Sequence, residues 1–318
     1  MSVKKYPYSI AGVSAEFGYY PIPCDFEDDH FSIKTLSGHA EKVASITRDV
    51  NVVGDWIYPA AHQRLDFDGN VRTLPYHSRV FGLPKTHVLT LHASECEEEL
   101  KFVVWCMSFF TGMRLTTTDA GFLDATPIKP EKLVDFILRR RTLVDSFKLS
   151  LNFLEQERNE PLNLQRVAAV IHALFLAQYP QSLPFERFQY LYMALDSCFK
   201  LLDIKTLKKT RPSHSSRIQW MCERLGITTP DWAESSITAP SAISVVRNNA
   251  LHEAIFFDQP LGFSLYGGNM AQLNNENVLL QMKALVCRIL VAILGRPNSD
   301  YVKSPVNTRM IHALELNL

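Results

Sequence analysis

The segment 241–257 constrains the fold more than any other stretch, because as a helix it is apolar on two opposite faces. A helix advances about 100° per residue, which assigns each side chain to a face. One face carries the apolar stripe Ile243, Val246, Ala250, Ala254 and Phe257. The opposite face carries Asn248 and His252 among Val245, Ile255 and Phe256. A helix that is apolar on both sides is normally buried on both, so we expect a second packed interface here, for instance with another subunit.

Length and composition restrict the class of protein. The chain has 318 residues, enough for two domains, and equal numbers of acidic and basic residues, 33 each, so its net charge does not indicate nucleic-acid binding. Its six cysteines show neither metal-site spacing nor a disulfide framework. We therefore expect no metal or other cofactor, free thiols, a cytoplasmic location and no membrane segment.

The sequence predicts an α+β protein in three parts. Residues 1–112 form a strand-rich N-terminal module of unknown role, with strands near 32–36, 50–53 and 87–91. This module ends in a helix over 94–110, opened by a capping box of Ser94 and Glu97. Residues 113–183 form a helical connector, with helices over 130–157 and 164–178. Residues 184–318 contain amphipathic helices over 184–203, 214–226, 241–257 and 277–294, which predict an antiparallel four-helix bundle.

The bundle segment resembles a known family. Arg247-Asn248 followed by three residues and His252 resembles the R-[N/D/H]-x-x-x-H signature of HEPN domains, which are four-helix bundles. The segment 188–196, FQYLYMALD, is similar to the Apea-like branch of HEPN domains, although Asp196 stands where that branch usually has Glu. The resemblance covers about residues 184–295. It implies a homodimer, RNA as the partner, and in many members ribonuclease activity at a site shared between two subunits.

The residue types suit RNA cleavage without a metal. A histidine can act as general acid or base near neutral pH, and an arginine fork matches phosphate oxygens. Asn248 can hold a ring nitrogen of His252, or a substrate oxygen, and so fix tautomer and orientation. We therefore expect Arg247, Asn248 and His252 to be catalytic, two facing copies to supply acid and base, and Asp196 to support the site by pairing with Arg247. The products would be a 2′,3′-cyclic phosphate and a 5′-hydroxyl end.

Other interpretations stay open. Arg247 and His252 can instead form a polar network that fixes helix packing, in a non-catalytic HEPN module that binds RNA or nucleotide and dimerises. By analogy the ribonuclease would act in prokaryotic defence or a toxin-like response, and a regulatory partner protein is one way to restrain it. A basic cluster either guides RNA or forms a solvated face, and it consists of Lys205, Lys208, Lys209, Arg211 and Arg217. Arg139, Arg140 and Arg141 are interpreted as a solvated face.

Overall fold

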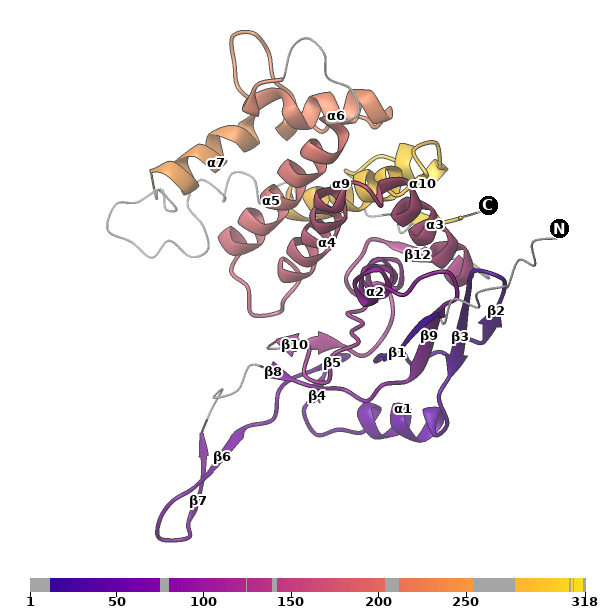
Figure 1. Ribbon diagram of the computed structural model, residues 1–318. Helices are drawn as coiled ribbons and strands as arrows, with labels where there is room; N and C mark the ends of the chain where they lie inside the picture. Colours follow the sequence, from indigo (N-terminus) through magenta and orange to yellow (C-terminus); the bar gives the residue numbers. More distant parts are fainter. Residues whose placement is uncertain are drawn as a thin grey trace, which may run out of the picture. The chain divides into compact units, whose positions relative to one another are not determined.

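The computed structural model describes residues 12–74, 80–123, 125–138, 142–203, 212–253, 278–308, 310 and 312–316 (Figure 1). The chain divides into two compact units. The first unit covers residues 1–108 and 113–130, and the second covers 109–112 and 131–318. Within the described residues the strands lie mostly in the N-terminal part and the long helices mostly in the C-terminal part. The expected α+β class is therefore confirmed.

The first unit is built around an antiparallel four-stranded sheet in the order β1-β9-β3-β2. Its strands are β1 Val13–Phe17, β2 Phe26–Glu27, β3 Phe31–Thr35 and β9 His87–Leu91. Strand β9 lies in the middle, and Leu91 aligns with Val13 on one side and Phe31 on the other. Its alternating sequence buries His87, Leu89 and Leu91 on one face, as expected for a strand of period two.

Short strands and two helices complete the first unit. Helix α1 spans His39–Thr47, and α2 spans Glu97–Thr111, its last residues belonging to the second unit. The short strands are β4 Val52–Val53, β5 Trp56–Ile57, β6 His62–Leu65, β7 Val71–Leu74, β8 Val80–Phe81, β10 Phe122–Leu123 and β11 Thr126–Pro127. Strands β6 and β7 form a hairpin, β8 pairs with β10, and β5 lies between β4 and β11. The expected capping box is wrong, because Ser94 Oγ donates to Glu99 and α2 begins at Glu97.

The second unit is mainly helical. Its helices are α3 Thr142–Glu157, α4 Pro161–Leu176, α5 Pro184–Asp203, α6 Arg217–Leu225, α7 Ala242–His252, α9 Val278–Ile293 and α10 Asp300–Lys303. Two 3₁₀ turns, η1 His214–Ser216 and η2 Asp231–Ala233, precede α6 and α7. Strands β12 Phe136–Leu138 and β13 His312–Leu314 form a parallel pair.

The helical core forms around α5. Among the described residues α5 has its most extensive contacts with α4 and α9, and α6 packs against α5 and α9 (Figure 1). Helix α9 is buried on nearly all sides and includes Arg288, which is 1% exposed. Arg288 donates to Asp135 Oδ2 at 2.6 Å, and the Tyr301 hydroxyl donates to the same carboxylate. Helix α7 contacts η1 and η2 more than any other described element.

The helix expected over 130–157 is wrong in its first part. The amide of Glu131 donates to the Thr111 carbonyl and that of Leu133 donates to the Gly112 carbonyl, so neither is available to a helix. Glu131 also has φ 69°, in the left-handed region. Residues 136–138 then pair with β13, and α3 begins at Thr142.

Candidate active site

The motif residues lie on the outer face of α7. Ile243, Val246 and Ala250 form the buried stripe predicted for this helix. His252 is the last residue of α7, and both it and Asn248 are exposed to solvent. Val245, two turns before His252 on the same face, is 42% exposed. In this single chain the face that carries His252 is therefore open, and Ile255 and Phe256 lie outside the described residues.

Arg247 connects the motif. Its Nη1 donates to His252 Nε2 at 2.6 Å and to Asn248 Oδ1 at 2.9 Å. The side chain therefore bends along the helix surface to reach a residue five positions later. Sequence reasoning allowed Asn248 to hold a ring nitrogen of His252 or a substrate oxygen; in the structure Asn248 Oδ1 accepts from Arg247, which also donates to His252. The arrangement places a permanent positive charge directly against an exposed imidazole.

An aromatic ring on α5 supports the guanidinium. Arg247 Cζ lies 5.9 Å from the centroid of the Tyr192 ring, within the range of a cation–π contact. Tyr192 itself is buried. Burial raises the pKa of its phenol, and the positive charge of Arg247 opposes that rise. The Tyr192 ring thus holds the Arg247 guanidinium by a cation–π contact, and the Tyr192 phenol stays neutral.

Asp196 pairs with a different arginine from the one expected. Its Oδ1 accepts from Arg217 Nη1 at 2.5 Å, whereas the prediction paired it with Arg247. Asp196 is one turn after Tyr192 on α5, and Arg217 begins α6, which packs against α5. The Arg217 guanidinium also lies over the Phe199 ring, with Cζ 4.7 Å from its centroid. The correct partner was therefore determined by the packing of α6.

A second histidine, missed by sequence reasoning, belongs to this region. His214 Nδ1 lies 2.9 Å from Arg217 Nη1, and its side chain is exposed. The available signal was the spacing of His214 and Arg217, three residues apart at a helix start, which places them one turn apart. Because η1 packs against α7, this second Arg–His pair neighbours the first.

The two pairs share one electrostatic environment. Burial lowers the pKa of His214, the charges of Arg217 and Arg247 lower it further, and Asp196 opposes them. Arg217, Arg247 and Asp196 also act on the phenol of Tyr192. The described cluster therefore contains two guanidinium groups, two exposed imidazoles and one carboxylate. Such a set suits an anionic group that is bound and receives or gives protons.

The remaining predicted RNA contacts cannot be placed next to this cluster. Lys205, Lys208, Lys209 and Arg211 lie outside the described residues, as do residues 139–141. Arg217, the described member of the predicted basic cluster, is engaged with Asp196 and His214. Its side chain is 16% exposed, so it is better placed to hold a bound group than to attract RNA from a distance.

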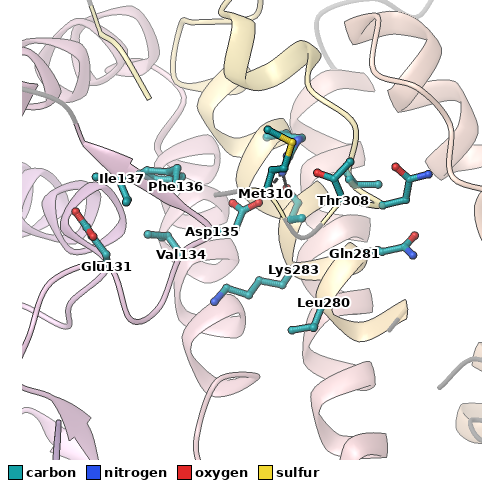
Figure 2. A pocket seen from close by; sticks show the side chains of 14 residues that line it. Glu131, Val134, Asp135, Phe136, Ile137, Leu280, Gln281, Lys283, Thr308 and Met310 are labelled. Carbon is teal, nitrogen blue, oxygen red and sulfur yellow. Dashed lines mark hydrogen bonds and ion pairs between the residues drawn. The ribbon is translucent and has the colours of Figure 1, made fainter. Parts of the chain in front are cut away.

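A separate cavity of about 390 Å³ lies between the β12 segment, α9 and residues 306–308 and 310 (Figure 2). Asp135 in its wall is engaged by Arg288 and Tyr301. Lys283 extends from α9 toward the side where Val134 and Glu131 lie, and burial lowers the pKa of its amine (Figure 2). Burial raises the pKa of Glu131. The cavity contains neither histidine of the candidate site.

Three further findings bear on the site. Within the described ranges no three His, Cys, Asp or Glu side chains lie close enough to hold a metal ion. None of the helices the structure describes combines the length and apolarity that crossing a membrane requires. Comparison with known proteins finds no family model, no curated protein and no solved structure that matches the chain.

Proposed function

We propose that this protein is a metal-independent endoribonuclease of the HEPN type, with α5, α6, α7 and α9 as its four-helix bundle. The observation that carries the proposal is the 2.6 Å contact between Arg247 and His252 on an exposed helix end. An imidazole and a guanidinium that are both accessible and in contact can act on the same phosphate group.

In the proposed reaction the arginine stabilises charge and the imidazoles transfer protons. Arg247 stabilises the crowded phosphate while one imidazole takes the proton of the 2′-hydroxyl. A second imidazole then protonates the leaving 5′-oxygen, which leaves a 2′,3′-cyclic phosphate and a 5′-hydroxyl end. In the HEPN arrangement, the second imidazole is His252 of another copy across a twofold axis.

Cleavage of labelled RNA in EDTA tests this proposal. His252→Gln and Arg247→Gln are each expected to reduce the rate by about 10²-fold or more, because each removes a group that acts on the reacting phosphate. His30→Gln changes an exposed histidine of the first unit and serves as the matched control, with no loss expected. Cleavage that survives both α7 substitutions, or that disappears in EDTA, would contradict the proposal.

The second candidate is a non-catalytic HEPN module that binds RNA or nucleotide and dimerises. The observation in its favour is that both guanidinium groups lie over aromatic rings, a geometry that also suits simple binding. In that case wild-type protein binds RNA in a salt-dependent way without cutting it, and Arg247→Gln weakens the binding. The cellular location and role are proposed from the resemblance alone. The protein would be cytoplasmic and would act in prokaryotic defence or a toxin-like response. A partner protein could regulate it.

A further inference from the structure

The cluster contains the same local arrangement twice. Arg247 Nη1 contacts His252 Nε2 at 2.6 Å, and Arg217 Nη1 contacts His214 Nδ1 at 2.9 Å. Both imidazoles are exposed, and both guanidinium groups lie over an aromatic ring of α5. The packing of η1 against α7 brings the two pairs to one surface of the second unit.

The tautomer of each imidazole follows from its partner. A guanidinium has only donors, so the nitrogen that faces it must present a lone pair. His252 therefore accepts through Nε2 and His214 accepts through Nδ1, and each neutral ring carries its proton on the other nitrogen. In this state the basic nitrogen of each ring is occupied, and neither histidine can take a proton from a substrate.

A phosphate oxygen is a stronger acceptor for a guanidinium than a neutral imidazole, because the hydrogen bond joins opposite charges and the planar fork can engage two oxygens. Each arginine also has unused capacity, since the Nε atoms of Arg217 and Arg247 are buried without a hydrogen-bond partner in the described part of the chain. Within the described residues, the carboxylate that contacts the pair formed by Arg217 and His214 is that of Asp196, which holds Arg217 in place.

We propose that His214 and Arg217 form a second half of the same anion site, and that a bound phosphate takes the guanidinium hydrogen bonds that the two imidazoles now accept. The proposal rests on the proposed function insofar as the phosphate is that of an RNA phosphodiester. Phosphate binding then frees the basic nitrogen of each ring beside a negative charge. One imidazole takes up a proton and becomes an acid, while the other stays neutral and serves as a base. A single chain thereby supplies both.

The charges around His214 determine the direction of this change. Burial is the largest cause that lowers the pKa of His214; Arg217, Arg247 and Lys200 lower it further, while Asp196 raises it. A bound phosphate draws both guanidinium groups toward itself and adds negative charge next to the ring. Both effects favour the protonated imidazole, so phosphate binding is expected to take up protons near pH 7.

Imidazole nitrogen NMR of the wild-type protein tests the proposal without relying on catalysis. Inorganic phosphate is added at pH 7 with ionic strength held constant by sodium chloride, and His214→Gln and His252→Gln assign the two signals. The signals of both histidines are expected to shift, one to protonated values and the other to those of a neutral ring released from its guanidinium, while that of His30 in the first unit stays in place. Calorimetry in two buffers of different ionisation enthalpy is expected to show proton uptake on binding.

Variants of the second pair sharpen the test. Arg217→Gln and His214→Gln are each expected to weaken phosphate binding, the former about ten-fold or more because it removes a charged donor. Arg224→Gln is the matched control, since Arg224 lies on the same helix over Trp220 and outside the cluster. Should Arg217→Gln unfold the protein, Arg217→Lys keeps the charge without the fork, and the wild-type NMR result stands by itself.

The outcomes separate this proposal from the proposed function. A response of His252 without one of His214 overturns the second pair, and the absence of any response overturns the phosphate site. If RNA is cut in a way that needs Arg247 and His252 while His214 stays silent, the ribonuclease proposal survives and this inference fails. If both signals respond but RNA stays intact, the phosphate site stands and the ribonuclease proposal fails.

Discussion

Lowering the pH is expected to destabilise the first unit through His87. This residue is fully buried at the start of β9, where it stacks on Phe17 and lies against His39. Burial, followed by the neighbouring His39, lowers its pKa from 6.5 to about 4. The folded state therefore keeps His87 neutral at pH 5, while the unfolded chain binds a proton. Stability from this group is complete above pH 6.5 and is lost as the pH falls toward 4.

The magnitude follows from the two pKa values. Each pH unit between them corresponds to about 1.4 kcal/mol, so the full loss is on the order of 3 kcal/mol and about 2 kcal/mol of it occurs between pH 7 and pH 5. Urea unfolding at those two pH values, followed by near-ultraviolet circular dichroism, measures the loss. His87→Phe keeps an aromatic ring beside Phe17 and is expected to remove about 2 kcal/mol of the pH dependence.

A matched control separates titration from packing. Thr86 Oγ1 lies 2.9 Å from His87 Nδ1 and also accepts from the Tyr20 amide at 2.9 Å, so Thr86→Val removes two hydrogen bonds and keeps the titrating ring. This variant should be less stable at both pH values by a similar amount, about 2–3 kcal/mol. If His87→Phe shows the same loss of stability from pH 7 to pH 5 as the wild type, the lowered pKa of His87 is refuted.

Two stability predictions concern the second unit. Arg288→Met should destabilise the fold by about 3–5 kcal/mol in urea unfolding because it leaves Asp135 without its ion-pair partner, and adding Asp135→Leu should recover part of that loss. Gly112→Ala should cost about 3 kcal/mol, because φ is 60° and the new Cβ would lie 2.7 Å from a backbone atom. Gly226→Ala should cost about 1 kcal/mol, because φ is 64° but the nearest atom is the end of a flexible lysine side chain. Equal costs for the two glycine substitutions would contradict the steric argument.

Elements with strong periodicity were predictable from the sequence. Strand β9 coincides with the predicted segment 87–91, because its alternation matches burial on one face. Helix α5 coincides with 184–203, where a proline opens the first turn and a long amphipathic pattern follows. Helix α1 was missed because it has only nine residues and begins after Gly38 in a left-handed conformation, without a side-chain cap. Short elements depend on tertiary contacts that periodicity does not encode.

The same distinction applies to the site. Arg247, Asn248 and His252 lie within two turns of one helix, so their proximity could be derived from spacing alone. The partner of Asp196 could not be derived from spacing, because Arg217 lies 21 residues away and its position depends on how α6 packs against α5. His214 was missed for the same reason: its relation to α7 arises from the packing of η1.

The geometry of α7 limits how a dimer could complete the site. Val245 and His252 share a face but are seven residues apart, which corresponds to about 10 Å along the helix. A twofold axis passing through Val245, perpendicular to α7, would place the two copies of His252 roughly 20 Å apart. Two imidazoles at that separation cannot act on one phosphodiester, whose reacting oxygens must each lie within hydrogen-bond reach of a ring. With a perpendicular axis, a composite site therefore requires that the axis pass near His252 itself, whereas an interface of that kind centred on Val245 requires the second imidazole from the same chain, the role proposed for His214.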